Sequence, residues 1–209
     1  EIGAVKVCNG EIVDRFSTFV NPEIPIPFRI ETLTHINDQM VMNAPKIEEI
    51  LPKFIEFCED AVMVAHNAEF DTSFIINKAE KIGINVDTTI IDTVLLAQFL
   101  MPNLHNYKLD TLTKHLNVVL ESHHRAVDDA AATADIFVKM IKMLYDRDIP
   151  DVDKLNEEGK MDENAIKKLH QYHCIILASN EMGRINLYRL ISASHLKYFN
   201  RFPKIPKSL

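Results

Sequence analysis

The sequence predicts an α/β domain, with a mixed sheet flanked by helices, followed by a small C-terminal α/β segment. Short β-prone runs alternate with longer segments of helical periodicity, a pattern typical of layered α/β folds. Residues 1–163 carry 15 basic and 29 acidic side chains, whereas residues 164–209 carry 8 and 1. This change of sign indicates a boundary. We therefore expect a domain over residues 1–146, a connector over 147–163 and a separate segment over 164–209.

The first element is predicted to be a β-hairpin. Residues 2–7 and 11–20 are rich in β-prone side chains, and Asn9-Gly10 between them favours a type I′ turn. The chain therefore begins in the middle of a sheet. Three prolines at positions 22, 25 and 27 then interrupt the pattern and predict a loop.

Helices and strands alternate in the middle of the chain. A helix is predicted over residues 45–59, with one buried stripe, and the short apolar run 61–65 predicts a strand covered on both faces. The following elements are predicted in order as a helix over 70–82, a strand over 89–91 and helices over 94–100, 109–116 and 126–145.

The C-terminal segment is predicted to contain one strand and one helix. Residues 174–178 form an apolar run, and a turn is expected near Gly183. An amphipathic helix follows, with a stripe formed by Leu187, Leu190, Ile191 and Ser194. Residues 201–209 are basic and contain prolines, so we do not expect them to close a domain.

Composition excludes several classes of protein. The three cysteines form no CxxC pair, so neither a disulfide framework nor a thiolate zinc site is indicated. No apolar run approaches the roughly 20 residues of a membrane span, and we expect a cytoplasmic protein without a membrane partner. The net charge of −7 argues against non-specific coating of nucleic acid, although bound divalent cations would offset carboxylates locally.

The helix predicted over residues 126–145 carries a candidate metal ligand. Its apolar residues form a stripe centred on Phe137. At about 100° per residue, Asp128 points away from this stripe, whereas Asp129 lies about 80° from its centre. We therefore expect Asp129 to reach a cleft and Asp128 to lie in water.

Asp71 is a second candidate metal ligand. It lies in the first turn of a predicted helix that closely follows a buried strand. In open α/β sheets, ligands bind at the carboxyl ends of strands. A lone aspartate in such a position is more often a helix cap than a ligand, but two such aspartates together favour a metal site.

His124 is the candidate catalytic base. It stands five residues before Asp129 on a predicted loop, and a histidine that titrates near neutrality can take a proton from water during phosphodiester hydrolysis. The neighbouring His123 is expected to have no role. The residues therefore indicate metal-dependent hydrolysis of a phosphodiester.

The chain resembles the DEDDh (DnaQ-like) 3′–5′ exonucleases over roughly residues 1–145. The second motif of that family resembles His66-Asn67-Ala68-Glu69-Phe70-Asp71, the third resembles His124-x-Ala-x-x-Asp129, and Tyr107-Lys108-Leu109-Asp110-Thr111-Leu112 between them is also similar to family members. The resemblance implies an RNase H-like fold that binds two divalent cations, Mg²⁺ or Mn²⁺, and acts on a DNA 3′ end. It gives His124 the role of general base, Asp71 and Asp129 that of metal ligands, and His66, Asn67 and Phe70 that of substrate-binding or site-shaping residues.

The C-terminal segment resembles part of a second domain. Tyr172-His173-Cys174-Ile175-Ile176-Leu177, with Asn180, Gly183, Asn186-Leu187-Tyr188 and Ile205-Pro206-Lys207-Ser208, is similar to the resumed PHP domain of the PolC-type DNA polymerases III. In that family a proofreading exonuclease is inserted inside the PHP domain. This resemblance implies that His173 belongs to a PHP metal site. It also implies that the partners are the rest of a polymerase chain and replisome components.

One family motif is absent from the sequence. The Asp-x-Glu of the first motif is expected on a central strand just upstream of Glu1, so the first central strand is predicted to be missing and these 209 residues to be an inactive fragment. Two alternatives stay open: a stand-alone DnaQ-like exonuclease acting on DNA or short RNA, and a non-catalytic nucleic-acid-binding module. An Asp-x-Glu in the upstream reading frame would favour truncation, and its absence would favour a degenerate module.

Overall fold

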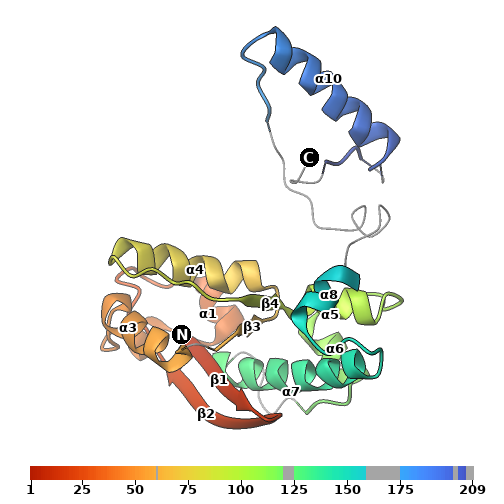
Figure 1. Cartoon of the computed structure of the whole chain (residues 1–209). Helices are drawn as coiled ribbons and strands as arrows, with labels where there is room; N and C mark the ends of the chain where they lie inside the picture. Colours follow the sequence, from red (N-terminus) through yellow and green to blue (C-terminus); the bar gives the residue numbers. More distant parts are fainter. Residues whose placement is uncertain (60, 120–124, 159–174, 200–201, 206–209) are drawn as a thin grey trace. The chain divides into compact units, whose positions relative to one another are not determined.

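The computed structural model describes residues 1–59, 61–119, 125–158, 175–199 and 202–205 (Figure 1). The chain divides into two compact units, Glu1–Pro150 and Asp151–Leu209. The limit between these units falls inside the range 147–163 that the sequence pattern assigns to a connector.

The first unit begins with the predicted hairpin. Strands β1 (Ile2–Cys8) and β2 (Glu11–Thr18) pair antiparallel, and the register shifts between Lys6 and Val7. Asn9 and Gly10 both have positive φ, 52° and 84°, as a type I′ turn requires. The local sequence therefore accounts for the hairpin.

Two short helices follow where the sequence predicted only a loop. They are α1 (Phe28–Thr34) and α2 (Asp38–Val41). No residue of α1 is buried, so this helix lacks the apolar stripe by which helices are recognised in a sequence.

Helix α3 (Ile47–Cys58) confirms the predicted buried stripe. Ile50, Leu51 and Phe54 are buried, and Leu51 and Phe54 form a cluster with Ala79 of helix α4 (Ala68–Lys81). The ring of Phe16, on β2, meets that of Phe54 edge to face with 5.5 Å between centroids. The hairpin and the two helices therefore share one core.

The predicted alternation of strands and helices is confirmed in the middle of the unit. Strands β3 (Met63–Ala65) and β4 (Ile90–Asp92) pair in parallel. Helix α4 follows β3, helix α5 (Thr93–Leu100) follows β4, and helix α6 (Leu109–His115) comes next. All three residues of β3 are only half-buried, so the prediction that this strand is covered on both faces is wrong.

Helix α7 (Ala126–Tyr145) has the predicted bounds and packs against both pairs of strands. A Cβ on Gly3 would come within 2.2 Å of the Val127 nitrogen, and one on Gly10 within 3.6 Å of Val138 Cγ1. The helix therefore runs along β1 in the same direction as the strand. The strand and the helix are closest at the first turn of α7, and only a glycine fits at the facing position of β1.

The buried face of α7 differs from the predicted one. The predicted centre, Phe137, is half-buried, whereas its neighbour Ile136 has no exposed surface. Ala132 and Met140, four residues to either side of Ile136, are buried too. Because α7 also packs against α5 and α6, its buried face is wider than one apolar stripe and turned toward Ile136.

The second unit contains helices α8 (Val152–Glu158) and α10 (Glu181–Leu196). Helix α8 lies where only a connector was predicted. The strand predicted over 174–178 is wrong for residues 175–178, which have no regular structure, and Cys174 lies outside the described residues. No helix in the described ranges combines the length and apolar character that crossing a bilayer requires.

The predicted turn near Gly183 is also wrong, whereas the predicted C-terminal helix is confirmed. Gly183 lies in the first turn of α10 and donates its N–H to the side chain of Asn180, 2.8 Å away. In the predicted stripe Ser194 is buried, but Ile191 is 45% exposed.

Candidate functional site

The carboxyl ends of β3 and β4 converge on one carboxylate. Asp92 ends β4, and its Oδ1 accepts the Val94 N–H at 2.8 Å and the Asn67 N–H at 3.1 Å. Its Oδ2 accepts the Ala68 N–H at 3.1 Å. One side chain therefore caps both α5 and α4, the helix that carries Asp71. Charge-assisted bonds of this kind are among the stronger hydrogen bonds in proteins.

His66 is held beside this carboxylate. Its Nδ1 lies 3.0 Å from the hydroxyl of Thr93, which is fully buried and also donates to the Ala65 carbonyl at 3.3 Å. Burial lowers the pKa of His66, while Asp92 and a bond to the backbone of Tyr107 act in the opposite direction. His66 therefore joins β3, the start of α5 and the 107–112 motif.

Asp71 lies in the first turn of α4. The residue is exposed, but neighbouring atoms desolvate its carboxyl, and this desolvation raises its pKa. The charge of Asp92 raises the pKa further, whereas a bond to its own backbone lowers it. A carboxylate that the protein alone disfavours is one that a nearby cation would stabilise.

Asp129 lies one turn before the buried Thr133, whose hydroxyl donates to the Asp129 carbonyl at 2.8 Å. Because the buried face of α7 is turned toward Ile136, Asp129 projects onto that face and not merely onto its border. Both Asp128 and Asp129 are half-buried. The prediction that Asp128 lies fully in water is therefore wrong, although Asp129 remains the inward-facing residue of the pair.

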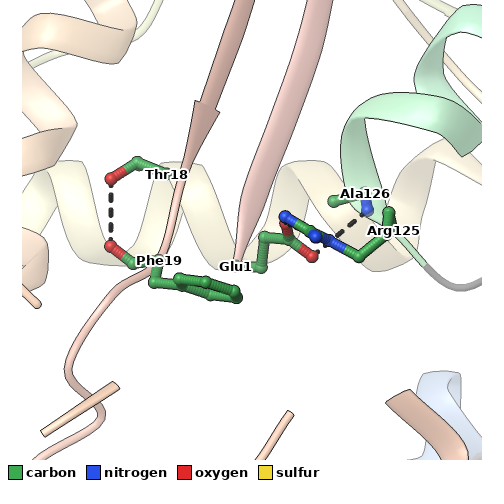
Figure 2. A network of polar contacts seen from close by, with 5 residues as sticks. All are labelled: Glu1, Thr18, Phe19, Arg125 and Ala126. Carbon is green, nitrogen blue, oxygen red and sulfur yellow. Dashed lines mark hydrogen bonds and ion pairs between the residues drawn. The ribbon is translucent and has the colours of Figure 1, made fainter. Parts of the chain in front are cut away.

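The first turn of α7 is fastened to β1 by an ion pair (Figure 2). Glu1 Oε1 accepts from Nε and Nη2 of Arg125 at 3.0 and 2.9 Å, and its Oε2 accepts the Ala126 N–H at 3.3 Å. The Glu1 side chain is only 5% exposed. The guanidinium of Arg125 also lies over the ring of Phe19, 5.3 Å from its centroid. These contacts fix the start of the helix that carries Asp129.

The two aspartates lie on helices that both pack against β3. Across the described ranges, no three side chains of His, Cys, Asp or Glu gather closely enough to hold a metal ion. His124 and His173 lie outside the described residues.

Two other predicted site residues, Asn67 and Phe70, shortly precede Asp71 in the sequence. Asn67 has a left-handed backbone, φ 67° and ψ 57°, and its own side chain makes no cap bond. Phe70 is 63% exposed, and its ring meets that of the equally exposed Phe74 edge to face, with 5.4 Å between centroids. The first two turns of α4 therefore present an aromatic pair on either side of Asp71 in the sequence.

Sequence reasoning missed three residues that organise this region: Asp92, Glu1 and Arg125. A signal for Asp92 was present, because an acidic residue that ends a β-prone run and precedes a helical one is a typical N-cap. The Glu1–Arg125 pair spans 124 positions in the sequence, and no local pattern indicates a contact at that separation.

Comparison with known proteins identifies the family of this chain. Residues 1–137 match the family model RNase_T, described as exonuclease. The whole chain is 53% identical to the PolC-type DNA polymerase III of Caldanaerobacter subterraneus subsp. tengcongensis and 50% identical to that of Clostridium perfringens. The chain spans only 15% and 14% of the length of these relatives.

Solved structures agree with the family model. The structure of Exonuclease X in complex with 5′ overhanging duplex DNA matches with a TM-score of 0.56 and 28% identity, over 67% of this chain and 80% of that one. A 3′-exonuclease that recognises the histone mRNA stem-loop matches with a TM-score of 0.55 and 19% identity, over 64% of this chain and 66% of that one. These neighbours confirm the predicted RNase H-like fold, and exonucleases of this kind depend on metal ions. The chain therefore belongs to the RNase_T exonuclease family.

Proposed function

We propose that residues 1–146 are the proofreading 3′–5′ exonuclease section of a PolC-type DNA polymerase III. The observation that carries this proposal is the match of the whole chain, at 53% identity, to such a polymerase. The polymerase chain that contains residues 1–209 is called the longer chain below. In it, the substrate is a mispaired primer 3′ end, which costs less to unpair than a matched one.

The chemistry of the site fits divalent cations. Asp71 and Asp129 supply carboxylate oxygens, the donors that Mg²⁺ and Mn²⁺ prefer. Desolvation, together with the charge of Asp92, raises the pKa of Asp71, and a nearby cation would stabilise the charged form of such a carboxylate. We infer that two cations bind with the help of these residues. When bound, they supply a nucleophilic water at neutral pH and stabilise the charge of the reacting phosphate.

The remaining roles belong to residues of this chain. His124 takes the proton of the attacking water. The exposed rings of Phe70 and Phe74 provide faces on which unpaired bases stack, an interaction worth about 1–3 kcal/mol per base. His66 and Asn67 hold the turn from β3 into α4 and so keep this aromatic pair beside Asp71.

The segment 164–209 is proposed to be part of a PHP domain, with His173 as a metal-site residue. Alignment of the whole chain with PolC-type polymerases supports this proposal, because a stand-alone exonuclease needs no such extension. The rest of the polymerase chain and the replisome are the partners that follow, and the cytoplasm is the compartment.

A nuclease assay on the longer chain tests the proposed function. The substrate is a primer labelled at its mispaired 3′ end, and the readout is the release of nucleoside monophosphate in Mg²⁺ or Mn²⁺. Asp71→Asn is expected to lower the rate by at least about a hundredfold, the scale of losing a ligand or electrostatic stabiliser. Glu69→Gln, two residues away in the same turn, is the matched control and should keep most of the rate. Equal rates for wild type and Asp71→Asn would overturn the proposal.

A further inference from the structure

We propose that Asp92 is a positioning residue of the exonuclease site, which holds the first turn of α4 in the conformation that presents Asp71. The role of Asp71 in this inference rests on the proposed function. The contacts of Asp92 do not depend on it. Asp92 is not a ligand candidate, because its two oxygens already accept three backbone N–H bonds, from Asn67, Ala68 and Val94.

The turn between β3 and α4 depends on a partner outside itself. Asn67 has a left-handed backbone, which costs a non-glycine residue roughly 1 kcal/mol. Its side chain, at the N-cap position, makes no cap bond. Asp92, 24 and 25 residues away in sequence, instead bonds the N–H groups of Ala68 and Asn67, two of the donors that the start of a helix leaves without a partner inside the helix. The geometry of the turn is therefore set from β4.

The position of Asp71 follows from that turn. The first backbone bond of α4 runs from the Phe70 N–H to the Asn67 carbonyl at 3.0 Å, and Asp71 is the next residue. A change at Asn67 therefore rotates the helical turn that carries the carboxylate. Supporting groups of this kind orient metal ligands in proteins generally, and their loss typically costs about 10–100-fold in metal affinity or activity.

A second contact makes the link rigid. His66 and Thr93 are the neighbours of Asn67 and Asp92, and they meet at 3.0 Å. Two adjacent residues at the end of β3 are thus bonded to two adjacent residues at the end of β4. A single carboxylate that serves two helices and a left-handed turn has more than a capping role, because a cap for α5 alone requires only the bond to Val94.

Substitution with serine separates the two roles of Asp92. A serine hydroxyl caps a helix well, so Asp92→Ser keeps the cap of α5 but is too short to reach α4 as well. Asp92→Asn keeps the length and loses the acceptor for Ala68, and it serves as the second variant if the serine variant does not fold. The side chain of Asp151 accepts the Lys154 N–H at 2.8 Å at the start of α8, so Asp151→Ser is the matched control.

The first measurement is amide hydrogen exchange on the longer chain, which requires no nuclease activity. Asp92→Ser is expected to speed exchange at Ala68 and Asp71 about tenfold, on the scale of a lost cap, and to leave the amides of α5 unchanged. Asp151→Ser should leave α4 as in the wild type. Equal acceleration in α4 and α5 would overturn the proposal, because it would show a general loss of stability.

The second measurement is the metal-concentration dependence of 3′-nucleotide release by the longer chain. Asp92→Ser is expected to raise the Mg²⁺ concentration that gives half of the maximal rate about tenfold, with the KM for DNA unchanged. A lower kcat with that Mg²⁺ concentration unchanged would overturn the proposal, since a merely structural loss reduces the amount of folded enzyme and not its metal affinity. If the wild-type longer chain releases no nucleotide, the proposed function fails, and amide exchange still decides the role of Asp92.

Discussion

At the scale of single residues, Asp71 and Asp129 are supported by different observations. Asp71 lies beside Asp92, and desolvation together with that charge raises its pKa. Asp129 begins the row of α7 residues that continues through the buried Thr133 and Met140. The first aspartate is therefore indicated by electrostatics and the second by geometry, and these two observations are independent.

The orientation of Asp128 and Asp129 on α7 predicts that substitutions at these two neighbouring positions have unequal effects in the longer chain. Asp129→Ala is expected to abolish 3′-nucleotide release, because the carboxylate on the inward side of α7 is removed. Asp128→Ala should leave most of the activity, since Asp128 lies about 80° from Ile136 around the helix whereas Asp129 lies only about 20° from it. Single-turnover nuclease assays of both variants measure the difference. An equal loss from both would rule out the projection of α7.

His66 predicts a pH dependence of stability. Burial holds its pKa below the ordinary value of 6.5, so the unfolded chain takes up a proton before the folded chain does. The free energy of unfolding therefore falls as the pH drops through 6.5, until the folded-state pKa is passed. Urea unfolding at several pH values should show a smaller decline for His66→Gln than for the wild type. The same decline in both would show that other groups cause it.

At the scale of elements, Gly3 and the first turn of α7 predict a steric requirement. A Cβ on Gly3 would lie within 2.2 Å of backbone atoms, so Gly3→Ala must push α7 away from β1. We expect a loss of about 2 kcal/mol, or roughly 5 °C in Tm.

Gly183→Ala is the control for this prediction. Gly183 lies inside α10, and a Cβ added there would have its nearest neighbouring atom 3.4 Å away, so alanine is expected to be neutral or slightly stabilising. Thermal unfolding followed by circular dichroism compares the two variants. A Tm for Gly3→Ala equal to that of the wild type would contradict the close packing of β1 and α7.

The same elements show which parts of the fold are predictable from sequence. The hairpin, α3 and α7 are predictable because turn residues or apolar periodicity encode them locally. Helix α1, which buries no residue, and helix α8 carry no such pattern. Residues 175–178 are apolar enough for a strand, yet they pair with no strand among the described residues, and pairing is not visible in a local sequence pattern.

The residues of the candidate site also differ in whether a local sequence pattern indicates them. Asp71 and Asp129 can be proposed from sequence because each occupies the start of a predicted helix, and the structure confirms both helices. The centre of the buried face of α7 is misplaced because α5 and α6 cover a second side of the helix, which no single helix reveals. The contacts of Asp92 with α4 and of Glu1 with α7 span 24 or more positions, so only the folded chain shows them, whereas the cap of α5 by Asp92 has a local signal.

At the scale of the whole molecule, we propose that Asp71 and Asp129 form part of a two-metal exonuclease site whose remaining ligands are supplied elsewhere in the longer chain. The described residues contain no group of three ligands, and two carboxylates leave such a site under-coordinated. The most direct measurement is the release of 3′-terminal nucleotides from mispaired and paired primers, in Mg²⁺ and Mn²⁺, by the longer chain and by residues 1–209 alone. We predict release by the longer chain, faster from the mispaired end and abolished by a chelator, and no measurable release by residues 1–209. Robust trimming by residues 1–209 that His124→Ala abolishes, or no trimming by the longer chain, would contradict this two-metal site.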